Sequence, residues 1–567
     1  MNYAKALRMG VLDKFERGSF FGHLHKNRET GNLHTPFEID KVFSGLPDTT
    51  DSDATTKTMR AWLEECEDFH EDCELESGRE CEFNGPLRLL DLQHGSVVLR
   101  ENAGNVRYAC LSHCWGTVTD NAIIKTTRET LDQFKIKVPE HCLPANLLDA
   151  IRVCRSLGID YLWIDSLCII QHSDEDWNTQ AAQMSDIYEN AHVTIAATRS
   201  ANALGGCYLR RHPKYLAEPV PAYEGVFVLL HPSGLTGDYK RSAVHSNQPL
   251  LERGWVYQEM RLSRRVLHFC DEEVIWVCQE SRLSESECDG LAFSSLDHPE
   301  RSWYTEMPHG LPSENPKVLW NRWVDEYSRL KLTYPHKDRM AALAGLAKRM
   351  QNHHDMGRYL SGLWENSLNV DLGWWTDHPP GDDSKKDPSN GSAEIPAYPS
   401  WSWASVNAPI EWDCDIHRHV PIVEIQHIDF VADGPVHMGV VSKSSGSITV
   451  KARALDSSDV HPPATKYDNA PTQIKGIDIW HYRPDRSVQG GQTKMGGLIL
   501  VISVRPVGSG IAVAIHVKLR NDHKTYERVG AVFLDYTSYG KKVEESNDDE
   551  DAIEPWESLP MMEVTIV

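Results

Sequence analysis

Residues 108–116 read YACLSHCWG and residues 161–171 read YLWIDSLCIIQ. Each stretch begins as a short apolar run, which is typical of a fully buried strand, and each run ends at polar side chains. Between the two runs lies an amphipathic helical pattern that ends at Gly158, a residue suited to a left-handed helix C-cap. The apolar stripe of this predicted helix consists of Leu147, Ala150, Ile151, Cys154 and Leu157. A strand–helix–strand order predicts parallel strands joined by a right-handed crossover.

The alternation continues along the chain. Ser173 and Asp176 have the spacing of a capping box and predict a helix start. A third buried strand is expected over residues 192–197, and the apolar runs at 266–269 and 274–277 add further β structure. We therefore expect an α/β fold with a mostly parallel sheet and inserted helices.

The rest of the chain differs in pattern. We expect a helix over 59–73, a strand pair at 87–92 and 96–99, and helical structure over 331–350. After a polar linker the apolar runs alternate with turn signals, which predicts an all-β sandwich or barrel. Its strands are expected at 421–431, 439–442, 447–454, 498–504, 511–519, 531–535 and 562–567. The predicted divisions are an N-terminal arm (1–57), an α/β domain (58–290), a helical extension packing on it (291–376), a linker (377–394) and a mainly β domain (395–567).

Composition narrows the class of protein. The 567 residues include 58 Lys and Arg against 82 Asp and Glu, a net charge of −24, which disfavours a nucleic-acid binder with a basic face. No apolar run is long enough for a membrane-spanning helix, and the first residues lack the apolar core of a signal peptide. Thirteen cysteines at irregular spacing are typical of reduced thiols, so we expect a cytoplasmic protein.

Polar residues follow the first two buried strands. Ser112, His113 and Trp115 come at the end of the first, where ligands usually bind in a parallel sheet. His113 is either a site residue or a histidine hydrogen-bonded beneath the following turn. Asp165 ends the second strand, where burial and neighbours can shift its pKa, or it binds the loop backbone. Cys168 is either a thiolate nucleophile or a small core residue.

A third patch, residues 253–259, reads RGWVYQE. Arg253 suits a phosphate or carboxylate, Trp255 can stack on a planar ligand, and Gln258 and Glu259 add polar contacts. The alternative is that Arg253 pairs with an acid such as Asp165 and ties this segment to the sheet.

Other motifs are missing from the sequence. It contains no phosphate-binding loop, dinucleotide fingerprint, zinc-protease helix or nucleophile elbow. Cys66, His70, Cys73 and Cys81 lack the paired short spacings of a zinc site, so no metal is expected.

Together these motifs resemble the fungal heterokaryon-incompatibility (HET) domain, in the form of a stand-alone protein. The matching strings are residues 111–116 (LSHCWG), 162–171 (LWIDSLCIIQ), 180–191 (QAAQMSDIYENA) and 253–259 (RGWVYQE), with similar flanks at 359–364 and 399–404. The resemblance covers about residues 59–410 and implies self/non-self recognition between fused fungal cells and programmed cell death. Because HET domains have been likened to Toll/interleukin-1-receptor (TIR) domains, it also implies a flavodoxin-like sheet.

Some TIR domains cleave NAD with one glutamate, and this suggests three hypotheses. The first is an effector that hydrolyses NAD, with no resident cofactor: Glu259 and Asp165 are the candidate carboxylates, Arg253 contacts the pyrophosphate, and Trp115 or Trp255 stacks on a ring. The second is a HET-scaffold enzyme of fungal secondary metabolism using His113, Asp165 and Cys168 on a small organic substrate. The third is a non-catalytic module that binds a protein partner. The sequence does not indicate an oligomeric state.

Overall fold

In a computed structural model, the chain divides into two compact units, residues 1–312 and 313–567. The described residues are 21–26, 46–74, 83–116, 124–213, 216, 218–219, 226–231, 248–285, 315–376, 398–413, 418–439, 441–442, 445–458, 460, 472–474, 477–485, 495–505, 511–535 and 555–567. The predicted linker at 377–394 and most of the predicted arm at 1–57 lie outside them. No described helix is both long and apolar enough to cross a membrane.

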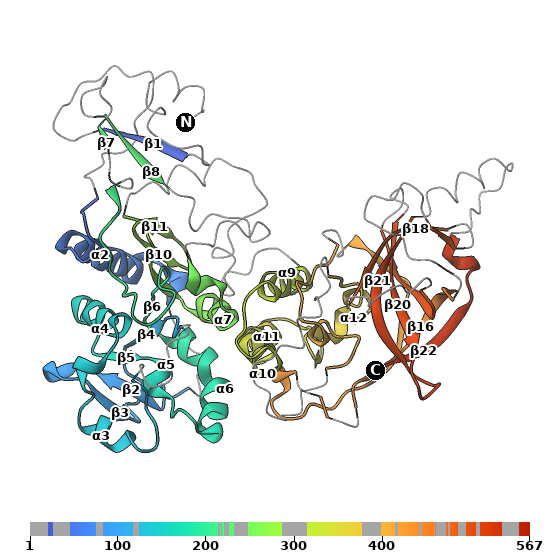
Figure 1. The fold of residues 1–567 in the computed structure, drawn as a ribbon, viewed down its shortest axis with the longest axis horizontal. Coiled ribbons are helices and arrows are strands. Elements are labelled where there is room, and N and C mark those ends of the chain that lie inside the picture. Colours follow the sequence, from blue (N-terminus) through green and yellow to red (C-terminus); the bar gives the residue numbers. More distant parts are fainter. Residues whose placement is uncertain are drawn as a thin grey trace. The chain divides into compact units, whose positions relative to one another are not determined.

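The first unit is built on an eight-stranded sheet in the order β11-β10-β9-β6-β4-β5-β2-β3 (Figure 1). Its strands are β2 (Arg88–Asp91), β3 (Val98–Glu101), β4 (Tyr108–Ser112), β5 (Tyr161–Trp163), β6 (Val193–Ala196), β9 (Arg265–Phe269), β10 (Val274–Cys278) and β11 (Arg282–Ser284). The four central strands, β5, β4, β6 and β9, run parallel to one another. Each of the outer strands, β2, β3, β10 and β11, pairs antiparallel with its neighbours. The expected α/β fold is confirmed, but the sheet is mixed and only partly parallel, whereas a mostly parallel sheet was expected.

Helices cover both faces of this sheet. They are α2 (Asp53–Phe69), α3 (Leu131–Ile136), α4 (Ala145–Leu157), α5 (Asp165–Cys168), α6 (Asp174–Asn190) and α7 (Gly254–Leu262). In Figure 1, α2 and α4 lie on one side of the strands, and α6 and α7 lie on the other. The chain leaves β4 towards β5 through α4 and returns across β4 to β6 through α6, which explains why these two helices lie on opposite faces.

Local sequence signals place these elements. Gly158 ends α4 in the left-handed conformation (φ 70°), and the Ser173 side chain accepts a hydrogen bond from the Asp176 backbone N–H at the start of α6, both as predicted. The helix expected from residue 59 begins earlier, at Asp53, because Ser52 caps it by accepting from the Thr55 N–H. A separate small sheet joins β1 (Phe21–Lys26), β8 (Val226–His231) and β7 (Glu218–Pro219).

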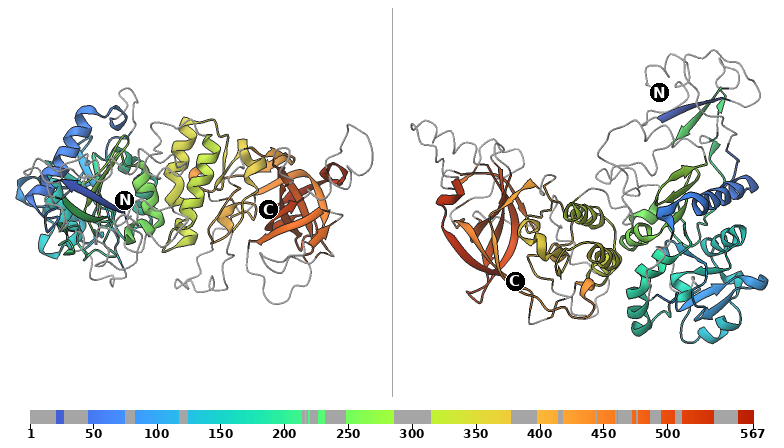
Figure 2. Two further views of the ribbon diagram at one scale, coloured as in Figure 1. Left: turned by 90° about the horizontal axis from the view of Figure 1, so that it is seen from above. Right: turned by 180° about the vertical axis from the view of Figure 1, so that it is seen from behind.

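The second unit begins with helices and continues as a nine-stranded, mostly antiparallel sheet (Figures 1 and 2). Its helices are α9 (Pro316–Ser328), α10 (Pro335–Asp338), α11 (Ala344–His353) and α12 (Leu368–Asp371), with a short hairpin of β12 (Tyr359–Leu360) and β13 (Leu363–Trp364). The sheet strands are β14 (Val420–Pro421), β15 (Glu424–Asp429), β16 (Ser447–Asp456), β17 (Thr472–Ile474), β18 (Ile477–Pro484), β19 (Leu498–Val504), β20 (Ile511–Leu519), β21 (Tyr526–Asp535) and β22 (Met561–Ile566).

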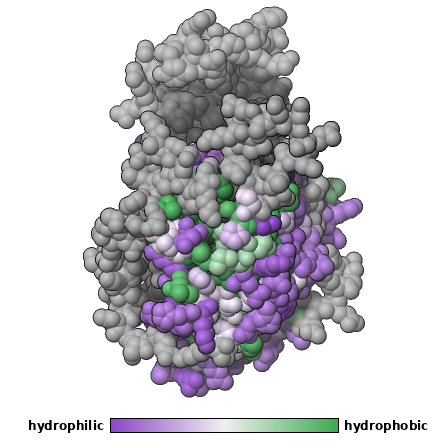
Figure 3. All heavy atoms as spheres, turned by 90° about the vertical axis from the view of Figure 1, so that its right-hand side faces the viewer, coloured by the Kyte–Doolittle hydropathy of each residue, from purple (hydrophilic) through white to green (hydrophobic). Residues whose placement is uncertain are grey.

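Five of these strands pair in a ring. β16 pairs with β19, β19 with β20, β20 with β21, β21 with β22, and β22 again with β16. Of the two predicted alternatives, sandwich or barrel, the pairing therefore corresponds to a barrel. The strand expected at 439–442 contributes only an isolated bridge between Ala432 and Val441, and sequence reasoning missed α9 and β18. Figure 3 shows the face that lies on the right in Figure 1. The described part of this face is mainly hydrophilic, with a small group of hydrophobic residues at its centre.

The helices α9–α12 belong to the same unit as the β region. The finer domain boundaries, at residues 57, 290, 376 and 394, stay predictions.

Candidate functional site

The candidate site lies where the connections of neighbouring parallel strands diverge. The chain leaves β4 in one direction, to β5, and leaves β6 in the other, to β9. In open α/β sheets such a switch point opens a crevice at the carboxyl ends of the strands, and ligands bind there. Ser112 ends β4, His113 follows it, and Asp165 comes two residues after β5.

The Asp165 carboxylate is held from two sides. Its oxygens accept hydrogen bonds from the Trp115 indole N–H at 2.9 and 3.1 Å and from the Ser166 backbone N–H at 2.7 Å. The Gln171 side chain donates to the main-chain oxygens of Asp165 and Ile169, which closes the turn after β5. The Asp165 side chain is 29% exposed, so solvent or a ligand can reach it.

His113 is the closest titratable neighbour of this carboxylate. Its Nδ1 lies 4.0 Å from an Asp165 oxygen, beyond hydrogen-bond distance, and neither ring nitrogen has a hydrogen-bond partner. Burial lowers the pKa of His113 from its ordinary value, with the Asp165 charge opposing this shift. A buried imidazole without a partner is costly, so the site favours a water or ligand that satisfies it.

Glu259 enters the same site from α7. It is 7% exposed, and it faces the hydroxyls of Ser112 and Tyr188 as well as the charges of Arg253 and Asp165. Burial raises the pKa of Glu259 to about 7, although the Ser112 hydroxyl and Arg253 act in the opposite direction. A carboxyl group that titrates near neutral pH is a frequent mark of a functional site.

Arg253 connects α7 to the sheet. It is the residue before α7, is half-buried, and its guanidinium donates to the main-chain oxygen of His113. Arg253 thus connects this segment to the sheet through a backbone oxygen just after β4, and not, among the contacts of the described residues, through an ion pair with Asp165.

The two aromatic residues of the third patch differ in exposure, because Trp255 is half-buried and Tyr257 is fully buried. Trp255 is half-buried and packs edge to face with Trp177 of α6, with ring centroids 6.3 Å apart. Gln258 is buried beside Glu259. The contact between Trp255 and Trp177 connects α7 to α6 on one face of the sheet, and Trp115 is half-buried like Trp255.

Cys168 has a different environment. Its side chain is fully buried and its sulfur lies 3.4 Å from the Ile164 backbone nitrogen, pointing back towards β5. Burial raises the pKa of the Cys168 thiol to about 12. Because a thiolate is the nucleophilic form, this placement favours the core interpretation of Cys168.

Several supporting residues were not identified from the sequence. Arg88 on β2 forms ion pairs with Asp176 (2.6 Å) and Glu101 (3.3 Å) and donates to the Cys168 main-chain oxygen, which fixes the turn behind Asp165. Gln180 on α6 is fully buried, and its amide has no hydrogen-bond partner. The only signal in the sequence for Gln180 is that it is the first residue of the matching string 180–191.

The backbone conformation at Gly116 explains why the first motif ends in glycine. It has a φ of +80°, and a Cβ at this position would lie 2.3 Å from the Cβ of Asn202. Only glycine fits both the left-handed backbone and the close approach of the loop after β6. The Trp-Gly pair therefore presents the Trp115 ring to Asp165.

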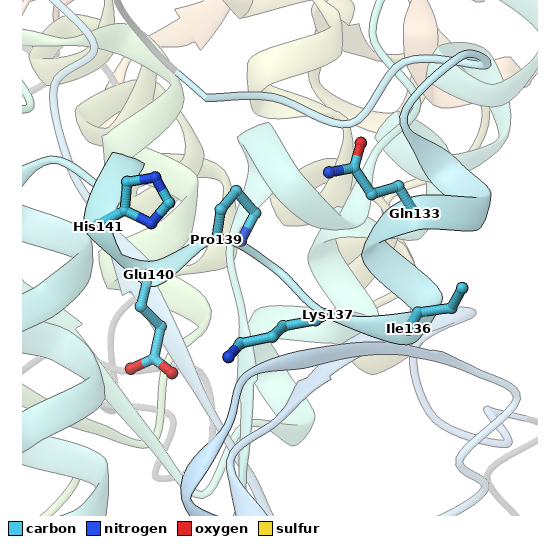
Figure 4. Close-up of a pocket in the computed structure, with 6 residues that line it drawn as sticks. All are labelled: Gln133, Ile136, Lys137, Pro139, Glu140 and His141. Carbon is cyan, nitrogen blue, oxygen red and sulfur yellow. The ribbon is translucent and has the colours of Figure 1, made fainter.

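Other hollows and clusters lie elsewhere in the unit. A hollow of about 430 Å³ occurs beside α3 (Figure 4), and none of its lining residues belongs to the four motifs. They are Gln133, Ile136, Lys137, Pro139, Glu140 and His141. Among the described residues, the one group of three or more potential ligands close enough to share a metal ion surrounds Cys66 and Cys278.

The fold and the site thus define an α/β domain with polar and titratable groups converging at the switch point of its parallel strands. Residues 108–259 match the family model described as heterokaryon incompatibility protein (HET). The match begins at the first residue of β4 and ends at Glu259, so this part of the chain is similar to the HET family. Neither the curated proteins nor the solved structures gave a match to the chain.

Proposed function

We propose that this chain acts in fungal self/non-self recognition and programmed cell death through its HET domain, and that the site between β4, β5 and α7 hydrolyses NAD. The HET match carries the first part of the proposal. The second part rests on one observation, the buried Glu259 carboxyl group that faces Ser112, Asp165 and Arg253.

In the proposed reaction, the bond between the ribose carbon and the pyridinium nitrogen of NAD breaks, and a bond between the ribose carbon and a water oxygen forms. When the first bond breaks, its electron pair goes to nitrogen and neutralises the ring, so the departing nicotinamide needs no proton. The ribose carbon becomes oxocarbenium-like, and an ionised carboxylate beside it stabilises the developing charge. Water then forms the new carbon–oxygen bond and releases a proton.

The roles of the site residues follow from their positions. Glu259 is the stabilising carboxylate, and Ser112 and Gln258 orient it or the ribose hydroxyls. The unprotonated ring nitrogen of neutral His113 accepts the proton of the attacking water, and Asp165 stabilises the imidazolium that forms. Arg253 is the cation for the pyrophosphate.

The aromatic residues complete this arrangement. Trp115 and Trp255 stack on the base rings, and the hydrogen bond from Trp115 to Asp165 fixes the plane of its indole. A net charge of −24 repels an anionic nucleotide, which makes Arg253 important for binding.

The test is incubation of the purified chain with NAD and chromatographic measurement of nicotinamide. We expect turnover that falls at least about 100-fold in Glu259→Gln and in Asp165→Asn, the range seen when one charge-stabilising group is removed. Glu140→Gln, a surface change beside α3, serves as the matched control and should keep wild-type turnover. An inactive wild type, or equal activity in wild type and both site variants, would refute NAD hydrolysis.

The pH profile gives a second test of the same role. The carboxylate form of Glu259 is the active one, and its pKa is about 7. We therefore expect kcat/KM for NAD to rise as the pH increases through about 7. A fall over this range would instead assign Glu259 as a general acid.

A second candidate function is supported by the unpartnered His113 beside Asp165. The two side chains suit acid–base chemistry on a small organic substrate, as in a biosynthetic enzyme built on the HET scaffold. Mass spectrometry of small molecules extracted from the purified chain would distinguish the two candidates. A co-purifying organic compound lost in His113→Ala would favour this second function, and neither turnover nor a ligand would favour a non-catalytic interaction module.

A further inference from the structure

Three thiols and an imidazole meet at the end of α2, in a part of the first unit that the HET match does not include. The potential ligand atoms of Cys66, His70, Cys73 and Cys278 all lie within 4.8 Å of one another. The Cys278 sulfur is 3.3 Å from Nδ1 of His70, and the Cys73 sulfur is 4.0 Å from the same nitrogen. The three cysteines are buried and His70 is half-buried.

Local structure brings three of these residues together. The helix α2 ends at Phe69, and the His70 backbone N–H donates to the Cys66 oxygen. A single 3-10 turn, Glu71–Cys73, then returns Cys73 towards the helix end, with its N–H donating to the His70 oxygen. A Cys-x3-His-x2-Cys spacing across a helix end therefore points all three side chains to one side.

The fourth residue comes from a distant part of the chain. Cys278 is the last residue of β10, immediately before the turn to β11. This turn is held to α2 by a further contact, because the Asp72 backbone N–H donates to the Glu280 carboxylate at 2.8 Å. The same two segments thus meet through the four ligand atoms and through a separate hydrogen bond.

The spacing of the atoms fits a tetrahedral metal ion. Zinc binds cysteine sulfur at about 2.3 Å and histidine nitrogen at about 2.0–2.1 Å, which places neighbouring ligand atoms about 3.5–3.8 Å apart. The sulfur–nitrogen separations of 3.3 and 4.0 Å at His70 lie on either side of this range. Thiolates with one imidazole are a soft donor set that selects zinc over magnesium or calcium.

Surrounding groups match what thiolate ligands require. The Arg265 Nε donates to the Cys66 sulfur at 3.1 Å, and the Ser281 backbone N–H donates to the Cys278 sulfur at 3.3 Å. Arg264 donates to the Cys73 main-chain oxygen at 3.1 Å. Three thiolates and a divalent ion leave a single net negative charge, which the Arg265 guanidinium balances. Such outer contacts orient ligands and stabilise their charged forms.

We propose that Cys66, His70, Cys73 and Cys278 bind one structural Zn²⁺. With four protein ligands the ion has no open position for substrate, so its role is to join the end of α2 to the edge of the sheet at β10 and β11. Because Arg265 begins β9 directly after α7, the ion also stabilises the segment that follows the Glu259 helix.

In the sequence, Cys81 is the next cysteine after Cys66 and Cys73, and the spacings of these three cysteines do not predict a metal site. Cys81 lies outside the described residues, and the fourth ligand comes from Cys278, which follows Cys73 by about two hundred positions. No local spacing could have indicated it.

The test is metal analysis of the purified full chain by inductively coupled plasma mass spectrometry. We expect about one zinc per chain, and loss of the metal in Cys73→Ser and Cys278→Ser. Cys154→Ala, which removes another buried thiol of the same unit, is the matched control and should keep the zinc. Metal-free wild type with all thiols reduced, or zinc retained in both cysteine variants, would overturn the proposal.

Two further measurements do not depend on the folding of those variants. His70→Cys should retain zinc through a four-cysteine set, and cobalt exchanged into the wild type should show the visible absorption of a tetrahedral thiolate site. A Cys66–Cys73 or Cys73–Cys278 disulfide found by mass spectrometry in place of metal would also overturn the assignment. None of these readouts depends on NAD turnover.

Discussion

Two tryptophan-containing segments, residues 112–115 and 401–403, use their polar groups differently. In the second unit, Trp401 and Trp403 each donate an indole N–H to a main-chain oxygen at 2.9 Å, and the Ser402 hydroxyl accepts from the Ala404 N–H. In the HET domain, Trp115 donates to a carboxylate, and the neighbouring His113 has no partner. Because buried polar groups in native proteins are usually hydrogen-bonded, the first arrangement is typical of a packed core, and the second leaves the His113 ring nitrogens without a partner.

Arg528→Ala should have the largest effect, and it tests whether the buried polar groups of the second unit contribute to its stability. The Arg528 side chain is fully buried, donates to Asp485 at 3.0 Å and to two main-chain oxygens, and lies 3.4 Å above the Trp374 ring. Removing one partner leaves a buried charge uncompensated, so we expect a loss of about 3–5 kcal/mol in the unfolding free energy of the second unit. Urea unfolding measures this, and the exposed Lys524→Ala should change stability by less than about 0.5 kcal/mol. An effect of Arg528→Ala no larger than that of Lys524→Ala would contradict a tightly satisfied core.

Glu259→Gln should have the opposite effect on the stability of the first unit. The pKa of Glu259 in the folded state, about 7, lies above its ordinary value of 4.5, so the folded state holds the proton more tightly. The stabilisation this gives is complete below pH 4.5 and is lost as the pH rises through 7. Above pH 7 the buried charge costs up to about 3 kcal/mol, and replacing it with a neutral amide should recover much of this.

Thermal unfolding of wild type and Glu259→Gln between pH 4 and 9 measures the difference. The two curves should approach one another at low pH and separate above neutrality, with the variant more stable. A variant that is less stable at pH 8 would show that the carboxylate is well paired and that the site resembles the second unit.

Trp115→Phe tests the hydrogen bond to Asp165. The change keeps an aromatic ring but removes the donor, so the carboxylate loses one of its two neighbours. A hydrogen bond to a charged group contributes about 1.5–3 kcal/mol, and partial exposure of Asp165 reduces the expected loss to about 1–2 kcal/mol. Nicotinamide release should fall together with stability, and unchanged turnover would separate Trp115 from the site.

Trp403→Phe should have the smallest effect. The Gly362 oxygen accepts from both Trp403 and Trp320 at 2.9 Å, so it keeps one partner after the change. We expect a loss of about 1 kcal/mol, measured by urea unfolding. A loss above about 3 kcal/mol would mean that the indole packing of Trp403, rather than its hydrogen bond, dominates this core.

The sequence predicted elements where one local signal is strong. The strand Tyr108–Ser112 and the cap at Gly158 are confirmed because an apolar run and a left-handed glycine each need little tertiary help. Within the site, the proximity of His113, Asp165 and Glu259 followed from the strand-end rule and the family resemblance. The hydrogen-bond partners of Trp115 and Arg253 could not be predicted, because each side chain had several polar residues within reach.

The remaining features depend on contacts between distant parts of the chain. Arg253 donates to the main-chain oxygen of His113, a partner that no sequence pattern displays. Cys278 was missed as a neighbour of Cys66 because the pairing of β9 with β10 decides where it lies. Short helices such as α5 likewise follow from the turn that Gln171 closes.

The pairing of β22 has a consequence for folding. This strand lies inside its sheet, between β16 and β21, and the Ser400 hydroxyl donates to the Val567 oxygen just beyond it. Until residues 561–566 have been synthesised, the facing edges of β16 and β21 expose unpaired backbone groups, which can pair with another chain. The ribosome therefore makes the element that closes the barrel more than a hundred residues after β16, and a nascent chain at this stage is the form most exposed to aggregation.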